Sequence, residues 1–369
     1  MQAHATVRTT VSLESAAPIV RRRLLRWYDR HRRELPWRRN PPDPYATLVS
    51  EFMLQQTQVK TVLPYFERFM RRFPTLRSLA SASIDDVLPF WAGLGYYRRC
   101  HHLHAAACAI VDRHQGRIPK DVEALRALPG VGAYTAGAIA SIVFNVAVPA
   151  VDGNVCRVLA RLRGDDPKSA GSRPLNEMLA ARLVAPRRPG DFNQALMELG
   201  ALICTPRSPD CPRCPLRALC PSRDRTAALP ARRKTPPSES PRTLHVVALA
   251  ILRKEQTFLV RRPDRGLWAG LYMWPTAECL PHADRDAVAL NLCRRLLPRA
   301  AALPRHAGHV RHVLTHRTVH FDVYVVRVSV GARPTITGRW RLPTSPGTDP
   351  PLSTAQRKLE ACLVSHASA

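Results

Sequence analysis

Two carboxylic acids occur where they could perform acid catalysis on a substrate. Glu51 lies in the segment LVSEFMLQQTQV, where Leu48, Phe52 and Met53 surround it with apolar side chains on a helix. A carboxyl group in such surroundings has a raised pKa and can serve as a proton donor. Asp152 follows in VDGNVCRVLARL, where a carboxylate held beside a substrate could stabilise a developing positive charge. Cleavage of a glycosidic bond uses this division of labour between two carboxyl groups.

Both acids also have an ordinary structural interpretation. Asp152, Gly153 and Asn154 can cap a helix that starts near Val155, and an exposed glutamate on a helix is unremarkable. The sequence alone does not bring Glu51 and Asp152 into one pocket. A shared pocket is therefore the condition on which the catalytic interpretation depends.

Four clustered cysteines indicate a compact metal centre. Cys204, Cys211, Cys214 and Cys220 form the pattern C-x6-C-x2-C-x5-C, and four thiolates suit either a tetrahedral zinc ion or a [4Fe-4S] cluster. Zinc knuckles more often pair two short C-x2-C units, so the longer arms of this pattern favour the cluster. The remaining cysteines are scattered in a chain without an export signal, and we expect buried, reduced thiols at these positions: Cys100, Cys108, Cys156, Cys279, Cys293 and Cys362.

A glycine turn joins two helices in the segment that leads to Asp152. The sequence predicts a short helix over 121–128, a tight turn over 129–132 and a second helix over 133–144. Gly130 and Gly132 allow the backbone N–H groups at the start of the second helix to face outward, where the helix dipole favours a phosphate. Such a hairpin grips a DNA backbone without reading bases. An ordinary helical hairpin with a glycine turn is the alternative.

The spacing of apolar residues divides the chain into two domains. Residues 17–221 show mostly helical spacing and predict an all-α domain, which includes the cysteine loop 204–220. A segment rich in Pro, Ser and charge over 222–242 is typical of a linker. Residues 243–369 predict an α+β domain, and residues 1–16 are expected to be disordered. Within the second domain we expect strands at 244–252, 258–260 and 318–328, and helices at 285–297 and 353–363.

The composition favours a polyanionic partner. The chain has 369 residues, a formal net charge of +28 and 45% hydrophobic residues, so it is basic and can still fold. An arginine-rich proteome would be the alternative cause of this charge. No apolar stretch approaches the ~20 residues of a membrane span, and the first residues lack the pattern of an export signal. We therefore expect a monomeric, cytoplasmic, nucleoid-associated protein of bacterial type with no membrane partner.

Several segments spanning nearly all of the first domain resemble the MutY family of helix-hairpin-helix DNA glycosylases. They are LPWR (35–38), SEFMLQQTQVKTVLPYFERF (50–69), GLGYYRR (93–99), LPGVGAYTAGAI (128–139), VDGNVCRVLAR (151–161), FNQALMELGALIC (192–204) and the cysteine loop. The resemblance implies an enzyme that removes adenine mispaired with 8-oxoguanine or guanine in double-stranded DNA, after the base has been flipped out of the helix.

The resemblance also implies a role for individual residues. Glu51 would protonate adenine at N7, Asp152 would stabilise the oxocarbenium ion or its covalent descendant, and Asn154 would orient these groups. Gln56 and Tyr96 would wedge into the duplex. The adenine pocket would be lined by Arg33, Leu35, Trp37, Arg38 and Gln194. The cysteines Cys204, Cys211, Cys214 and Cys220 would hold a [4Fe-4S] cluster whose loop presents Arg207 and Arg213 to phosphates.

The residue at the position of Tyr134 distinguishes bifunctional from monofunctional members of this superfamily. It stands where bifunctional members such as endonuclease III carry a nucleophilic lysine, so the resemblance implies a monofunctional catalytic site with little or no strand-nicking activity. A tyrosine there is also compatible with the thymine or uracil mismatch glycosylases, which are the alternative within the superfamily. A non-catalytic DNA-binding iron–sulfur protein is the alternative outside enzymes.

The second domain resembles the Nudix-like domain with which this family recognises 8-oxoguanine. The segments are FLVRRP (258–263), GLWAGLYMWP (266–275) and VLTHRTVHFDVY (313–324). Residues 276–297 offer Glu278 and Asp284 but lack the REx2EE pattern of the hydrolases' glutamate-rich metal box, which argues against a nucleotide hydrolase. The family's Phe-Ser-His loop is Leu314-Thr315-His316 here. Thr315 and His316 keep the hydroxyl and the imidazole, but without the aromatic ring we expect weaker discrimination of 8-oxoguanine from guanine.

Overall fold

The computed structural model describes residues 15–165, 172–223, 242–263, 266–299, 302–314, 317–342 and 350–367. By their contacts the residues form two compact units, one from 1–81 and 102–233 and the other from 82–101 and 234–369. Most of the predicted disordered segment 1–16 and of the predicted linker 222–242 lies outside the described residues, as do Thr315 and His316.

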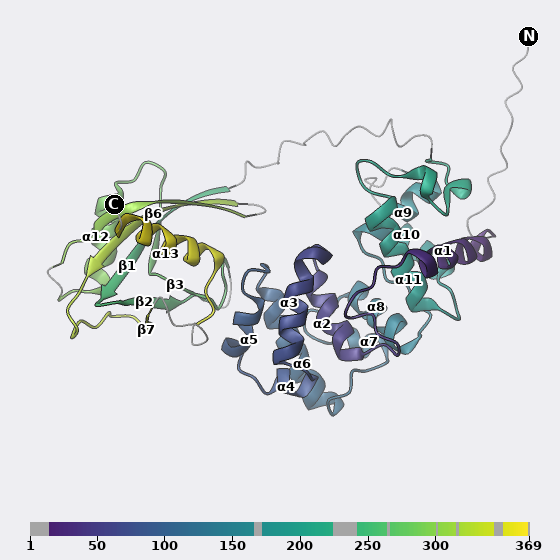
Figure 1. Cartoon of the computed structure of the whole chain (residues 1–369), viewed down its shortest axis with the longest axis horizontal. Coiled ribbons are helices and arrows are strands. Elements are labelled where there is room, and N and C mark those ends of the chain that lie inside the picture. The colour runs from purple at the N-terminus through teal and green to yellow at the C-terminus, as the bar shows by residue number, and fades with distance from the viewer. Residues whose placement is uncertain are drawn as a thin grey trace, which may run out of the picture. The chain divides into compact units, whose positions relative to one another are not determined.

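The first unit is helical, as the spacing of its apolar residues predicted. One core joins α1, α9, α10 and α11, with side chains such as Val20, Leu24, Leu159 and Leu196 fully buried or nearly so. Figure 1 shows these helices side by side. The helices are α1 (Ala17–His31), α2 (Pro44–Leu54), α3 (Val59–Arg72), α4 (Leu76–Ala80), α6 (Arg98–His114, whose first residues belong to the other unit), α7 (Val122–Arg126), α8 (Ala133–Phe144), α9 (Gly153–Arg163), α10 (Ser172–Leu183) and α11 (Pro189–Glu198).

The predicted hairpin is present as α7 and α8. Helix α8 has the expected bounds, whereas α7 is shorter than 121–128 because Asp121 caps it, its Oδ1 accepting from Ala124 N at 2.8 Å, and Ala127 already ends it. In the turn, Val131 N donates to Leu128 O at 3.1 Å. This places Gly130 at φ 74°, in the left-handed region that favours glycine.

The second unit contains a seven-stranded sheet with the order β3-β2-β1-β6-β5, with β4 also paired to β1 and β7 to β2. Its strands are β1 (Arg242–Arg253), β2 (Gln256–Arg261), β3 (Tyr272–Met273), β4 (Thr276–Cys279), β5 (Arg305–Val313), β6 (Arg317–Arg327) and β7 (Arg339–Arg341). Side chains alternate along β1, so that Ala248 joins one core and Leu249 the other. Helix α13 (Thr354–Ala367) contributes to the first core and α12 (Arg285–Leu296) to the second, which confirms an α+β unit (Figure 1).

Strand β5 was not predicted from the sequence. Its residues RHAGHVRHV carry few apolar side chains, because β5 lies at the end of the strand order and pairs only with β6. An edge strand packs on fewer neighbours than a central strand and tolerates polar residues. The short strand β4 was missed for a similar reason, since three of its four residues are only half-buried.

No helix in the described part of the chain is long and apolar enough to cross a membrane. No disulfide joins any of the ten cysteines, all of which are described, but the expectation that the scattered ones are buried was wrong for most of them. Only Cys100 and Cys293 are fully buried, and Cys108, Cys156, Cys279 and Cys362 are half-buried.

The two glycines of the hairpin turn should respond differently to alanine. In Gly130→Ala the new Cβ would lie 2.5 Å from His102 Cβ, and the alanine would have to adopt a positive φ that disfavours it. We therefore expect the unfolding free energy to fall by about 2 kcal/mol. Gly132→Ala is the matched control, because nothing lies within 4 Å of its Cβ position, and it should stay within about 0.5 kcal/mol of the parent. Urea unfolding followed by circular dichroism measures both. Equal effects would contradict the steric explanation.

Candidate active site

A cavity of about 1590 Å³ opens in the helical unit and collects the predicted site residues of that unit. Both carboxylic acids, Glu51 and Asp152, line it, so the condition set by the sequence analysis is met. The other predicted residues along its wall are Arg33, Leu35, Trp37, Arg38, Gln56, Tyr134, Asn154 and Gln194.

Glu51 is buried with only 6% of its surface exposed. It lies on α2, which Asp43 caps by accepting hydrogen bonds from Tyr45 N at 2.9 Å and Ala46 N at 3.2 Å. Burial raises the pKa of Glu51 from its ordinary 4.5 to about 7, and the negative charge of Asp152 acts in the same direction. Among the described residues, Glu51 Oε2 has no hydrogen-bond partner. With a pKa of about 7, the carboxyl group is mostly protonated in slightly acidic solution, and Glu51 lines the cavity.

Asp152 both caps a helix and lines the cavity, the two roles that the sequence suggested. It is the N-cap of α9, and its Oδ1 accepts from Val155 N at 2.7 Å. Its Oδ2 accepts from Asn154 Nδ2 at 3.0 Å. The helix begins at Gly153, slightly earlier than predicted. These two hydrogen bonds fix the orientation of the Asp152 carboxyl group at the cavity wall.

The side chain of Asn154 is itself held by a hydrogen bond from an arginine, Arg157. Arg157 Nη2 donates to Asn154 Oδ1 at 2.9 Å and to Gly200 O at 2.8 Å, while its Nε donates to Cys204 O at 2.9 Å. A side chain on Gly200 would collide with Asn154, because the Cβ atoms would be 2.7 Å apart. Hydrogen bonds therefore connect Asp152 with the first of the clustered cysteines.

Tyr134 lies on α8 beside the two acids. Its hydroxyl oxygen lies 3.6 Å from Met197 Sδ, and the same hydroxyl can donate to Glu51. Burial, together with the negative charges of Glu51 and Asp152, raises the pKa of Tyr134 well above its usual value. Tyr134 therefore stays a neutral hydroxyl group, and the bond to Glu51 keeps the pKa of Glu51 from rising further.

Sequence reasoning missed one residue of the cavity, Glu198. Its buried carboxylate binds Arg33 Nε at 2.9 Å and Arg38 Nη1 at 2.8 Å, while Arg38 Nε donates to Gln194 at 2.8 Å. Gln194 and Glu198 are four residues apart on α11, so they share a helix face. The spacing of four residues from Gln194 was the signal in the sequence that could have indicated Glu198. Trp37 completes this wall and packs edge-on against Phe66 with the ring centroids 5.1 Å apart.

The clustered cysteines lie in the loop that follows α11. Burial raises the pKa of Cys214 to about 12, and the charges of Cys204, Cys220 and Cys211 act in the same direction, so these three cysteines lie near Cys214. The buried Arg161 donates to Cys204 Sγ at 3.2 Å and to Thr205 O at 2.8 Å. The donor set and this convergence fit a group held by four thiolates.

The remaining predicted residues lie elsewhere. Tyr96 belongs to the other unit, on the loop between α5 (Ile84–Trp91) and α6, where its φ is 48° and 42% of its surface is exposed. Gly130 and Gly132 form the hairpin turn. Thr315 and His316 fall between β5 and β6, outside the described residues.

Comparison with known families defines the class of protein. Residues 49–181 match the model of the HhH-GPD superfamily of base excision DNA repair proteins, and residues 246–361 match that of the NUDIX domain. A thermostable thymine-DNA glycosylase of known structure is 27% identical, with a TM-score of 0.54, over 58% of this chain and all of that chain.

Sequence relatives narrow the class to a family. The adenine DNA glycosylase of Mycolicibacterium smegmatis is 42% identical over 66% of this chain and 84% of its own length. The human adenine DNA glycosylase is 41% identical over 82% of this chain, and the chain spans 65% of that protein's length. The chain belongs to the adenine DNA glycosylase family.

The raised pKa of Glu51 should appear in the pH dependence of stability. Because the folded state holds this proton more tightly than the unfolded state, the parent protein loses stability as the pH rises from about 4.5 to about 7. Glu51→Gln removes this loss, so its stability relative to the parent should increase by about 3 kcal/mol between pH 5 and pH 8.

Urea unfolding at both pH values measures the difference. The control is Glu67→Gln, which changes an exposed carboxyl group on α3. The control should track the parent at both pH values. A constant difference between Glu51→Gln and the parent would show that the pKa of Glu51 is not raised.

Proposed function

We propose that the protein removes adenine opposite 8-oxoguanine or guanine in double-stranded DNA by hydrolysing the N-glycosidic bond. The observation that carries this proposal is the pairing of Glu51, protonated by burial, with Asp152, oriented as a carboxylate, on the wall of one cavity. The family of the chain supplies the substrate class. A thymine or uracil mismatch activity is the competing possibility within the superfamily.

In this proposal the two acids act on opposite parts of the nucleotide. Glu51 donates its proton to N7 of the extruded adenine, which lets the electron pair of the C1′–N9 bond leave with the base. Asp152 stabilises the positive charge on the sugar. Water then adds to C1′ and loses a proton. Tyr134 offers a hydroxyl and no amine beside C1′, so the product is an intact abasic site.

The arginines of the cavity would hold the base. Glu198 fixes Arg33 and Arg38, and Gln194 is hydrogen-bonded to Arg38, so the polar groups of this wall are already ordered before substrate arrives. Leu35 and Trp37 would add apolar contact. Gln56 and Tyr96 would fill the space that the base leaves in the duplex, and Thr315 and His316 would contact 8-oxoguanine.

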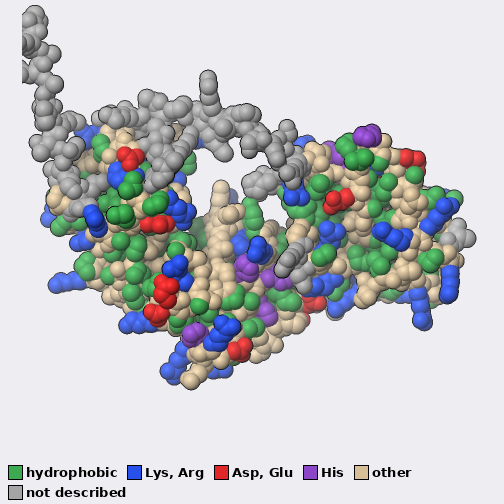
Figure 2. Space-filling model, turned by 180° about the vertical axis from the view of Figure 1, so that it is seen from behind, with side chains coloured by type: hydrophobic (Ala, Val, Ile, Leu, Met, Phe, Trp, Pro, Cys, Tyr) green, Lys and Arg blue, Asp and Glu red, His purple; other side chains and the backbone are tan. Residues whose placement is uncertain are grey.

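The charge of the chain suits DNA as the partner. The net charge is +28, and Figure 2 shows many more Lys and Arg than Asp and Glu side chains on the visible face. The outward-facing start of α8 after Gly132 has no side-chain cap, so its N–H groups are available to a phosphate. We propose that a monomer binds the duplex.

We propose that Cys204, Cys211, Cys214 and Cys220 hold a [4Fe-4S] cluster. A tetrahedral zinc ion would bring its sulfurs to about 3.8 Å from one another. No three of these sulfurs lie within 4.8 Å of one another in the described residues, which suits a larger group. When bound, the cluster would fix the loop that carries Arg207 and Arg213 and leave the chemistry to Glu51 and Asp152.

The function is tested by base release from A:8-oxoG, A:G, T:G and U:G duplexes. We expect adenine release from the first two and a strand that breaks only after alkali. Release of thymine or uracil, without adenine, would replace the proposal by the competing activity.

The role of Glu51 is tested in the same assay. Glu51→Gln removes the proton donor while preserving shape, so release should fall at least about 100-fold with duplex binding retained. Activity of the parent should decline above about pH 7 as Glu51 loses its proton. Glu67→Gln should keep full activity. A fully active Glu51→Gln variant would exclude Glu51 as the acid.

The cluster is tested by iron content and visible absorbance. Cys214→Ser removes one proposed ligand, so the absorbance band and most of about four irons per chain should be lost. The matched control is Cys108→Ser, a half-buried cysteine on α6 outside the loop, which should keep both. Zinc in place of iron in the purified parent would refute the assignment.

A further inference from the structure

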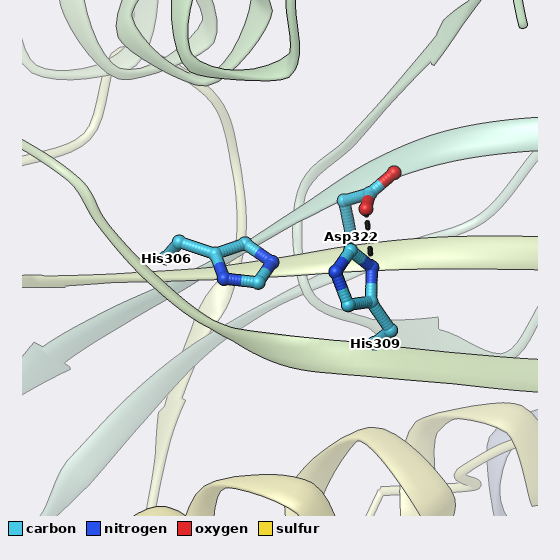
Figure 3. Close-up of side chains that lie close together, drawn as sticks. All are labelled: His306, His309 and Asp322. Atoms are coloured by element: carbon cyan, nitrogen blue, oxygen red, sulfur yellow. Dashed lines mark ion pairs between the residues drawn. The ribbon is translucent and has the colours of Figure 1, made fainter.

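A group of possible metal ligands lies on the sheet of the second unit. His306 and His309 of β5 and Asp322 of β6 each offer one ligand atom, and these atoms all lie within 4.8 Å of one another. Figure 3 shows the ring of His306 facing His309, which is paired with Asp322. None of the three residues belongs to the proposed active site or to the cysteine loop.

A β-bulge brings the two histidines to one side of β5. Residues three apart on a regular strand face opposite sides of a sheet. The register shifts between His306 and Gly308, and the extra residue turns both histidines to the face that Asp322 occupies. Gly308 has φ 132°, which glycine tolerates. His309 and Asp322 are directly paired in the ladder, so the backbone itself sets their proximity.

The carboxylate of this group is oriented in advance. Asp322 is 6% exposed, and its Oδ2 forms an ion pair with Arg285 Nε at 3.0 Å. Its Oδ1 is thereby left for His309 Nδ1, at 2.5 Å. A partner that fixes one oxygen of a ligating carboxylate is a common feature of metal sites.

The ion pairs of Asp322 with Arg285 and His309 do not explain the position of His306. Arg285, Asp322 and His309 form a sufficient network of charges without it. The ring of His306 nevertheless lies 4.6 Å from that of His309 and edge-on to Tyr324 at 5.2 Å. Tyr324 is anchored through its hydroxyl, which donates to Asp286 at 2.6 Å. His306 is thus directed to the same point as the other two ligands.

We propose that His306, His309 and Asp322 bind a divalent zinc ion. Two imidazoles and one carboxylate match the ligands of three-residue zinc sites, in which water takes the fourth position. Zinc would take the place of the direct contact between His309 Nδ1 and Asp322 Oδ1. Ligand atoms around zinc are about 3.3 Å apart, and the exposed side chains of His306 and His309 can rotate to close that distance.

The ion would connect β5 to β6 beside the bulge, since His306 and His309 lie on β5 and Asp322 on β6. The pairing of the two strands continues from His309–Asp322 to Val313–Thr318, about 13 Å along the strand. A bound ion would therefore stabilise the pairing of β5 with β6.

The proposal is tested on the full chain by zinc loading, removal of free metal and elemental analysis. The parent, the double variant His306→Ala/His309→Ala and the control His282→Ala are compared, since His282 is an exposed histidine of the same unit outside the ligand group. The parent and the control should retain about one zinc ion more per chain than the double variant. The cysteine loop is unchanged in all three, so metal bound there cancels in the difference.

A second readout is thermal unfolding with and without zinc. An ion that binds only the folded state raises the melting temperature, so the parent and His282→Ala should gain stability and the double variant should not. Asp322→Asn keeps the shape of the side chain and removes the anionic ligand, and it should also lose the zinc response. Equal zinc content and equal shifts in all variants would overturn the proposal. The result is independent of whether adenine is the substrate.

Discussion

The active site depends on the burial of one carboxyl group that has no ion-pair partner among the described residues. Glu51 lies on an almost fully buried helix, α2, and desolvation raises its pKa to about 7. An arginine in direct contact would have produced an ordinary carboxylate. The nearby arginines Arg33 and Arg38 are instead engaged by Glu198. Arg38 still lowers the pKa of Glu51, but this effect is smaller than that of burial.

The second acid is held by a different means. Asp152 accepts hydrogen bonds from the start of α9 and from Asn154, which fix its orientation. The two carboxyl groups thus differ in environment, and in the proposed mechanism they take different roles. Because Asn154 is bound by Arg157, and Arg157 by Cys204 O, a change in the cysteine loop would reach Asp152 through these hydrogen bonds.

The second unit also buries a carboxyl group, that of Asp322, but pairs it with charged partners on the sheet. Val247 and Leu249 of β1 join the apolar core beside α12, whereas Asp322 of β6 is buried on that face beside Arg285 and His309. A buried carboxylate is retained only with such partners. The bulge of β5 then adds His306, which an uninterrupted strand would have placed on the other face.

Much of the fold followed from the sequence because its signals are local. The helical spacing of the first half, the glycine turn before α8 and the cap at Asp152 each need only neighbouring residues, and α8 has the predicted bounds. The edge strand β5 was missed because polar residues are tolerated where a strand pairs on one side only. Which unit the segment 82–101 joins was likewise decided by contacts distant in sequence.

The sequence by itself determined which chemical groups are available: two carboxyl groups, four clustered thiols and a tyrosine in place of an amine. Only the tertiary structure decided their state. The pKa of Glu51, the engagement of Arg33 and Arg38 by Glu198, and the convergence of His306 on Asp322 depend on residues far apart in the chain. Desolvation and electrostatic interaction act through space, so no local pattern of residues records them.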